Sequence, residues 1–240
     1  MSFITNRTFG TRPVVFHAQG PEVLHPLWPE VCDRFFALPP RRIGPIPDLT
    51  ILTWNNGHPG MGILERSLDH LGIPYVVTGR GVEEWVNARD KPRLTRDALR
   101  TIETPYVLGI DSGDAILVDD PAHLVGWLET RFRCDLVFGA DRINFPNLKS
   151  YKEFEDKLPG AAASEFRYLN GGVWIGRTEF CREFFAEACE TPPDEVRPAA
   201  EQGILKKLFQ RHVPRVQLDY TCAMFQNLGF VFLSIFDFDA

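Results

Sequence analysis

The feature that most constrains the fold is an alternation of two apolar patterns through the middle of the chain. Short apolar runs rich in β-branched residues, typical of buried strands, lie at 48–54, 73–79, 105–110 and 135–141. Segments with apolar residues at helical spacing lie between them, at 60–72, 91–102 and 121–132. Strands that alternate with helices in this way are typical of a mostly parallel sheet with helices on both faces. We therefore predict an α/β fold.

The rest of the chain continues this reading with less regular signals. We expect a strand over 167–176, helices near 179–190 and 199–211, and a strand-like tail over 229–240. Asp120 and Pro121 predict the start of the helix over 121–132, as N-cap and first helical residue. The proline-rich segment 37–48 predicts a surface linker between two structured parts.

Composition excludes some classes of protein. The net charge of −6 and a pI near 5.6 argue against a nucleic-acid binder, which usually carries a basic face. The five cysteines follow no CxxC spacing, which favours reduced thiols over a disulfide framework or a zinc site. The first residues lack the apolar core of a signal peptide, and no run is long enough to predict a membrane span. We expect a cytoplasmic protein.

Two carboxylates, Asp111 and Asp114, stand in one short turn after the apolar run "YVLGI". In an open α/β sheet, ligands bind beyond the carboxyl ends of the strands. Two carboxylates this close repel each other unless a cation or a proton lies between them, and oxygen ligands of this kind suit Mg²⁺ or Mn²⁺. An Asx-type turn with two solvated acids explains an isolated DxxD equally well. The turn alone leaves both interpretations open.

Further stretches follow the acidic turn in a recognisable order: "LVFGADRINFPN", "RYLNGGVWIG", "EQGILKKLF" and "VQLDYTCAMFQNLG". Together with "ILTWNNG", "VVTGRGVEEW" and "DKPRLTRDAL" upstream, they resemble the glycosyltransferase domain of procollagen lysyl hydroxylases and collagen glycosyltransferases, with their bacterial and viral relatives. The resemblance covers most of 49–235. It implies a GT-A (Rossmann-like nucleotide-diphospho-sugar transferase) fold, a UDP-sugar donor and a divalent metal, usually Mn²⁺.

The resemblance also implies roles for single residues. Asp111 and Asp114 match the two acidic metal ligands of the family. Thr53 falls on the residue beside the uracil, Trp85 on an aromatic residue of the donor pocket, and Lys91 on a basic residue near it.

Three more positions carry over from the sugar side and the nucleotide side of the family's site. Asn170 matches the asparagine of an "LNSGG" strand, and Glu201 matches the end of an acidic run that closes the donor site, here reduced to "RPAAEQ". We take both as catalytic candidates, with Glu201 positioning the sugar or the acceptor. Gly113 stands where the family has an aromatic residue, so Trp54 or Trp85 would supply the ring contact to the nucleotide.

The family's third metal ligand is a histidine in an "HGNGP" loop at the C-terminal end of its domain. Here a similar stretch, "RPVVFHAQGP", lies at the beginning of the chain and contains His17 and Gly20, with Ala18 and Gln19 in place of glycine and asparagine. We interpret His17 as the third metal ligand and Gly20 as part of the donor site; a partly buried structural histidine is the alternative. An imidazole nitrogen beside two carboxylates suits Mn²⁺ better than Mg²⁺.

This placement predicts a circularly permuted order in one domain spanning 1–240. Residues 1–36 would match the family's C-terminal segment, 37–48 would be a linker, and 49–240 would form the GT-A core. Joined end to end, the tail "FDFDA" and the start "SFITNRTFG" would form a β-hairpin that leads to His17. Termini of compact domains are often close, which makes such a rearrangement easy.

The resemblance predicts transfer of glucose or galactose from a UDP-sugar to a hydroxyl acceptor, a glycan or a protein. A non-catalytic nucleotide-sugar binding module is the alternative from another class. A sugar nucleotidyltransferase is a weaker one, because its glycine-rich N-terminal phosphate loop is missing. The stretch "DSGDA" does not fit the DxDx(T/V) motif of aspartyl phosphatases.

Overall fold

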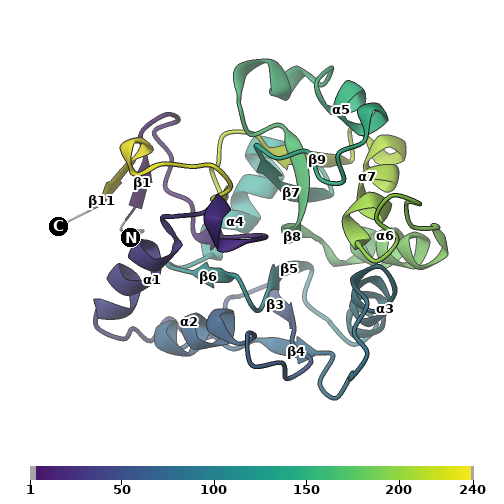
Figure 1. Ribbon diagram of the computed structural model, residues 1–240. Coiled ribbons are helices and arrows are strands. Elements are labelled where there is room, and N and C mark those ends of the chain that lie inside the picture. Colours follow the sequence, from purple (N-terminus) through teal and green to yellow (C-terminus); the bar gives the residue numbers. More distant parts are fainter. Residues whose placement is uncertain (1–3, 239–240) are drawn as a thin grey trace.

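A computed structural model describes residues 4–238 (Figure 1). Its main sheet has six strands in the order β4-β3-β5-β8-β7-β9. Their bounds are β3 Leu49–Trp54, β4 Val76–Thr78, β5 Tyr106–Asp111, β7 Leu136–Asp141, β8 Tyr168–Arg177 and β9 Val216–Asp219. β3 runs parallel to β4 and β5, β7 runs parallel to β9, and β8 is antiparallel to both of its neighbours. The predicted α/β fold with a mostly parallel sheet is confirmed.

Helices cover this sheet from both sides (Figure 1). Helices α3, α6 and α7 pack together on one side, whereas α1 and α2 lie on the other. The helices span α1 Trp28–Ala37, α2 Ile63–Leu71, α3 Asn87–Leu99, α4 Ala122–Trp127, α5 Lys149–Glu155, α6 Thr178–Glu190 and α7 Glu201–His212. A π-helical segment, Leu128–Phe132, extends α4. None of the helices among residues 4–238 is long and apolar enough to span a membrane.

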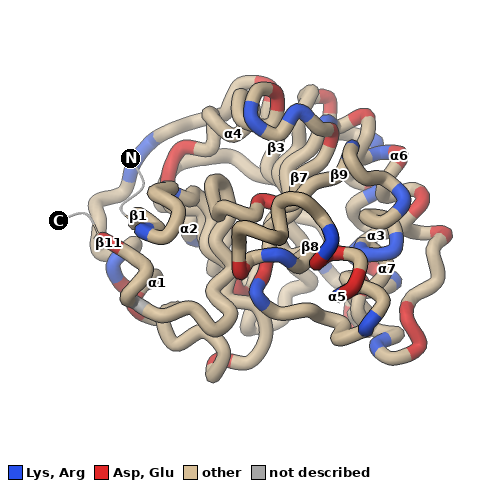
Figure 2. Tube along the Cα trace, turned by 90° about the horizontal axis from the view of Figure 1, so that it is seen from above, with Lys and Arg blue, Asp and Glu red and all other residues tan. Residues whose placement is uncertain are grey.

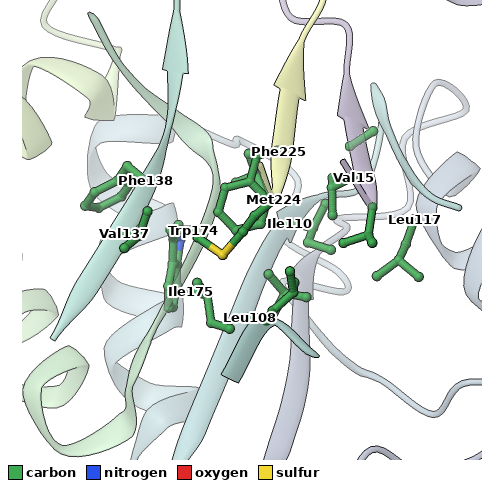
Figure 3. Packing of buried hydrophobic residues seen from close by; sticks show 14 of the residues in the cluster. Val15, Leu108, Ile110, Leu117, Val137, Phe138, Trp174, Ile175, Met224 and Phe225 are labelled. Atoms are coloured by element: carbon green, nitrogen blue, oxygen red, sulfur yellow. The ribbon is translucent and has the colours of Figure 1, made fainter. Parts of the chain in front are cut away.

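A second, three-stranded sheet joins the two ends of the chain to its middle. β2 (Val15–His17) runs parallel to β10 (Phe225–Asn227) and antiparallel to β6 (Ala115–Leu117). Apolar side chains from this sheet pack against those of the main sheet, so that Val15, Leu117 and Phe225 share one core with Ile110 and Trp174 (Figure 3). This shared core fixes the N-terminal strand β2 relative to the end of β5.

The two ends of the described chain pair with each other. β1 (Ile4–Asn6) is antiparallel to β11 (Phe236–Phe238), in the arrangement expected for the hairpin (Figure 1). Residues 1–3 and 239–240 of that expected hairpin lie outside the described residues. The permuted chain order itself, and the division into segments at 36 and 48, stay predictions.

Several boundaries differ from the sequence-based expectations. The tail expected as one strand over 229–240 contains, in its described part, a turn, a 3-10 segment at Leu233–Ile235 and only the short β11. The positive φ of Phe230 (54°) breaks the extended path there, and its N–H donates to the carbonyl of Leu24. The helix predicted over 121–132 begins at Ala122, and the carboxylate of Asp120 accepts a hydrogen bond from its N–H.

Two further segments differ from the sequence-based expectations in their structure or in their contacts. Helix α1, which the sequence analysis did not assign, turns Val31, Cys32 and Phe35 into the core. The proline-rich segment 37–48 has no regular structure after α1 ends, but the N–H of Ile43 donates to the carbonyl of Leu71 at the end of α2. That segment is therefore attached to the domain along its path.

The state of the cysteines and the distribution of charged residues can be compared with what the composition predicts. All five cysteines are free thiols, as expected. Among the described residues, Lys and Arg are interspersed with Asp and Glu instead of gathering by sign (Figure 2). The expectation that the chain binds no nucleic acid stays a prediction.

Candidate functional site

Strand pairing brings His17 to the acidic turn. β5 ends at Asp111, the turn carries Asp114, and β6 begins at the next residue, Ala115. Because β2 pairs with β6 so that His17 lies opposite Ala115, the imidazole comes to rest beside both carboxylates. The backbone confirms this register, since the N–H of Ala18 donates to the carbonyl of Asp114 at 2.7 Å.

The three side chains form one cluster. His17 Nε2 lies 3.4 Å from Asp114 Oδ1 and 3.8 Å from Asp111 Oδ2. One donor atom from each of the three residues lies within 4.8 Å of the other two, which is close enough for a shared metal ion. The predicted proximity of these residues is therefore confirmed, and their role as metal ligands is taken up below.

The histidine is oriented so that one nitrogen is free for a ligand. Asn227 Nδ2 donates to the carbonyl of Ala140 at 2.8 Å, which leaves Asn227 Oδ1 to accept from His17 Nδ1, also at 2.8 Å. In the neutral ring the proton is thus on Nδ1, and the lone pair is on Nε2. Nε2 is buried and has no hydrogen-bond partner among the described residues. A metal-ligating histidine is typically held in this way by its second nitrogen.

The paired glycines of β8 make room for this arrangement. A Cβ atom on Gly172 would lie 2.1 Å from His17 Cε1, and one on Gly171 would lie 2.5 Å from a methyl group of Leu205. Any side chain at Gly172 would therefore displace the imidazole. Close packing explains both glycines, as is common for glycine within a strand.

The electrostatics of the cluster reflect a shortage of positive charge. Burial alone would lower the pKa of His17, but Asp114 and Asp111 raise it to about 9. Burial raises the pKa of Asp111 to about 6, although Lys91 opposes the shift. Burial would likewise raise the pKa of Asp114, but its interaction with His17 lowers it below the ordinary value. The proton on His17 and the ammonium of Lys91 both lie beside these carboxylates, so they occupy a place that favours positive charge.

Lys91 links the cluster to helix α7. Its Nζ lies 2.6 Å from Asp111 Oδ1 and 3.0 Å from Glu201 Oε1, and 4.8 Å from the ring centre of Trp54. The structure thus brings three predicted residues together beside the cluster of His17, Asp111 and Asp114: Lys91, Glu201 and Trp54. Trp54 is itself buried, and its Nε1 donates to Thr95 Oγ1 at 2.9 Å.

Two cavities meet at the carboxylates. The larger, of about 620 Å³, is lined by His17, Gly20, Asn170, Gly172 and Glu201, among others. The smaller, of about 320 Å³, is lined by Trp54, Trp85, Lys91 and Gly113, among others. Asn87, Asp111 and Asp114 line both. A molecule with two ends can therefore lie across the carboxylates with one end in each cavity.

Thr53 is the sequence-predicted site residue that lines neither cavity. Its side chain is buried, and its Oγ1 donates to the carbonyl of Ile110 at 2.7 Å. It thus stabilises the pairing of β3 with β5 directly below the site. Contact of Thr53 with a nucleotide stays a prediction.

Asn170 is oriented by a carboxylate that the sequence analysis did not single out. Asp141, at the end of β7, accepts from Asn170 Nδ2 at 3.0 Å and from the side chain of Gln19. It lies in the larger cavity, and burial raises its pKa. Its position at the carboxyl end of a strand was the available signal. Asn227 was missed as well, although it is a polar residue within an apolar stretch.

Comparison with known proteins adds one finding. Residues 47–233 match the family model of the PLOD GT domain, which covers well over half of the chain. Asp111, Asp114, Asn170 and Glu201 fall within the matched range, whereas His17 precedes it. A search of curated proteins gives no significant match.

Proposed function

The chain belongs to the PLOD GT domain family of glycosyltransferases, and from this membership we propose that it transfers a hexose, glucose or galactose, from a UDP-sugar to a hydroxyl acceptor with the help of a divalent metal ion. The observation that carries the proposal is the cluster of His17, Asp111 and Asp114 at the meeting point of two cavities. Nucleotide-sugar donors have a nucleotide end and a sugar end joined by a diphosphate, which fits this layout.

The donor set fits a metal ion. Two carboxylates and an imidazole nitrogen with a free lone pair favour Mn²⁺ over Mg²⁺, because nitrogen ligands suit the former better. When bound, the ion would supply positive charge to the diphosphate oxygens as the bond to the sugar breaks. His17, Asp111 and Asp114 would hold it, and Lys91 would contribute a second positive charge nearby.

The remaining residues divide between the two ends of the donor. In the smaller cavity Trp85, with Trp54 at its inner wall, offers rings for the uracil, and Gly113 lines the cavity between the two carboxylates. In the larger cavity Asn170 and Glu201 would bind the sugar and the acceptor, with the backbone of Gly20 at its rim. Hydroxyl groups are well matched by such amide and carboxylate oxygens.

Glu201 is the candidate for handling the acceptor proton. It lines the larger cavity and accepts from Lys91, which keeps the carboxylate in place. In an inverting reaction it would take the proton of the attacking hydroxyl. In a retaining reaction the leaving phosphate could take it, and Glu201 would then only orient the acceptor.

The test is release of UDP from UDP-glucose and from UDP-galactose, with Mn²⁺ and after chelation. We expect activity that depends on Mn²⁺ and that falls at least tenfold in Asp111→Ala, Asp114→Ala and His17→Ala. Full activity in any one of these variants would remove that residue from the metal site. The alternative, a nucleotide-sugar binding module, predicts UDP-sugar binding without release and without an effect of Asp114→Ala.

A further inference from the structure

The larger cavity has a polar floor and an apolar mouth. Its buried lining residues include Asp141, Asn170 and Glu201, which carry carboxylate and amide groups. Its solvent-exposed lining residues are mostly apolar and include Pro21, Phe145, Val196, Pro198 and Ala199. Among the exposed residues that line it, Arg197 is the sole charged one.

Two of these apolar side chains are conspicuous for their exposure. Phe145 is 39% exposed and Val196 is 60% exposed, although both border a cavity of about 620 Å³. Large apolar side chains that remain in water beside a cavity with convergent polar groups are typical of a ligand site.

Phe145 is held in place, which argues against a disordered loop. Gln202 Nε2 donates to the carbonyl of Phe145 at 2.8 Å, and Lys206 Nζ donates to Asn144 Oδ1 at 2.9 Å. The same glutamine accepts from the N–H of Gly171 through its Oε1 at 3.1 Å. The apolar wall is thus connected directly to strand β8 at the floor.

A second segment of the chain also brings apolar side chains to the cavity. Leu24 lines the cavity, and its carbonyl accepts from the N–H of Phe230, which is 52% exposed. Val23, next to Leu24, is exposed as well. A ligand that reaches out of the cavity therefore meets apolar groups from two segments of the chain.

We infer that the acceptor of this enzyme carries an alkyl or aryl group next to its hydroxyl-bearing polar part. This inference rests on the proposed function, because it places the acceptor in the larger cavity. The polar part would lie on the floor beside Glu201 and Asn170, whose carboxylate and amide groups match hydroxyls. The apolar part would lie against Phe145 and Val196 and leave water.

The experiment compares matched acceptors that differ only in the apolar part. Methyl and hexyl β-glucosides, and the same pair of β-galactosides, are offered with UDP-glucose or UDP-galactose and Mn²⁺, below the concentration at which the hexyl compounds form micelles. We expect kcat/KM for a hexyl glycoside to exceed that for its methyl partner by about tenfold, since burial of two methylene groups accounts for an effect of that size. Equal values for both pairs would overturn the inference.

Variants locate the effect in the cavity. Phe145→Ser and Val196→Ser should each reduce the hexyl-to-methyl ratio to about threefold or less. Val213→Ser is the matched control for Val196→Ser, because Val213 is 38% exposed but follows the far end of helix α7, whose 12 residues span about 18 Å. A ratio that falls equally in all three variants would contradict the assignment to this cavity.

A binding measurement separates this inference from the proposed function. Calorimetry with UDP, Mn²⁺ and each glycoside reports the preference even when no UDP is released. Tighter binding of a hexyl glycoside, lost in Phe145→Ser, supports the apolar subsite whether or not transfer occurs. Metal-dependent release of UDP without any preference for hexyl over methyl glycosides, in kcat/KM or in binding, supports the proposed function and refutes the inferred acceptor class.

Discussion

Two buried lysines, Lys91 on α3 and Lys206 on α7, show how differently one residue type is used in this molecule. Both side chains are almost fully removed from water, and each forms an ion pair with a glutamate, Glu201 and Glu155 respectively. Lys91 lines the smaller cavity, whereas Lys206 pairs with Glu155 of α5, which also contacts the start of β8 at Leu169. The comparison separates a functional ion pair from a structural one.

The pair of Lys206 and Glu155 matches one positive charge with one negative charge and is closed to solvent. Both side chains are about 1% exposed. Glu155 Oε1 accepts from the N–H of Leu169, and Lys206 also donates to Asn144. Burial dominates here, since it lowers the pKa of Lys206 and raises that of Glu155. A pair of this kind holds α5, α7 and β8 together and has no open side.

Around Lys91, by contrast, carboxylates outnumber the ammonium group, and the side chain borders a cavity. Lys91 faces two carboxylates, Asp111 and Glu201, and a third, Asp114, lies across the cluster. Burial alone would lower the pKa of Lys91, but Asp111 and Glu201 raise it above its ordinary value. An excess of buried negative charge beside a cavity marks a place for a cationic ligand, whereas a neutral, closed pair marks a structural element.

The largest expected effect tests the structural pair. Lys206→Met leaves the charge of Glu155 buried without its partner, so we expect the free energy of unfolding to fall by about 3–5 kcal/mol, measured by urea denaturation. The double variant Lys206→Met/Glu155→Leu should regain at least about half of that loss, because it removes the unpaired charge. A double variant as unstable as the single one would show that the pair is not the cause.

The matching substitution at Lys91 sharpens the contrast. In Lys91→Met the carboxylates of Asp111 and Glu201 lose their ammonium, but a metal ion can still bind beside Asp111. We therefore expect Mn²⁺ to restore part of the stability difference between Lys91→Met and the unsubstituted protein, and none of the corresponding difference for Lys206→Met, because Mn²⁺ stabilises the folded state of Lys206→Met and of the unsubstituted protein alike. Equal rescue of both variants would mean that the two lysines do not differ in this way.

Much of the fold was predictable from the sequence, because long elements carry their own pattern. The strands β3, β5 and β7 and the helix α2 follow from apolar runs and helical spacing. Strands of three residues, such as Val15–His17 and Phe225–Asn227, carry no measurable period, and the partners of β2 lie about one hundred residues or more away along the chain. The small sheet therefore depends on tertiary packing that no local pattern records.

A further prediction concerns the pH dependence of stability, through His17. Its pKa is raised to about 9, above the ordinary 6.5, so the stability that its protonated form contributes is complete below pH 6.5 and is lost as pH rises to 9. We expect the metal-free protein to lose about 1 kcal/mol of unfolding free energy per pH unit across this window. With saturating Mn²⁺ the slope should flatten, because a ligating imidazole carries no proton on Nε2.

Cysteine ionisation requires a control in this experiment. The thiols of Cys32 and Cys134 have pKa values raised by burial to about 12, so ionisation of the unfolded chain also reduces stability near pH 9. The metal-free variant His17→Gln keeps that contribution and loses the one from the histidine. If His17→Gln shows the same slope as the unsubstituted protein, the assignment to His17 is wrong.

Another prediction compares the two glutamates. Glu201→Gln should reduce sugar transfer about tenfold or more, yet change the unfolding free energy by less than ~1 kcal/mol, because Lys91 keeps Asp111 as its partner at 2.6 Å. Glu155→Gln should do the reverse: it destabilises the fold and leaves the affinity for Mn²⁺ unchanged, since Lys206 loses its ion-pair partner. UDP-release assays, calorimetric titration with Mn²⁺ and urea denaturation of both variants distinguish the two patterns.

The candidate site was predictable only where its residues carry a motif. Asp111 and Asp114 form a recognisable turn, and His17 follows from the resemblance of its flanking residues. Asn227 gave no such signal, because it acts across 210 positions of sequence through one hydrogen bond to His17. Asp141 carried only the general signal of its position at the end of β7, because its contacts with Gln19 and Asn170 come from a loop and another strand and form no motif.

The smallest expected effect concerns Asn227, which acts on the cluster through His17. Asn227→Leu removes the acceptor for His17 Nδ1–H, so the neutral ring can place its proton on either nitrogen. We expect the affinity for Mn²⁺ to fall about tenfold, and ¹⁵N NMR of the metal-free protein above pH 9 to show a mixture of tautomers instead of the Nδ1–H form. Asn227→Asp retains an acceptor oxygen and should restore that form. If Asn227→Leu kept both the single tautomer and the full affinity, the orientation of His17 would have to come from its packing against Gly172 alone. Strand β10, which carries Asn227, would then have no part in preparing the cluster for a metal ion.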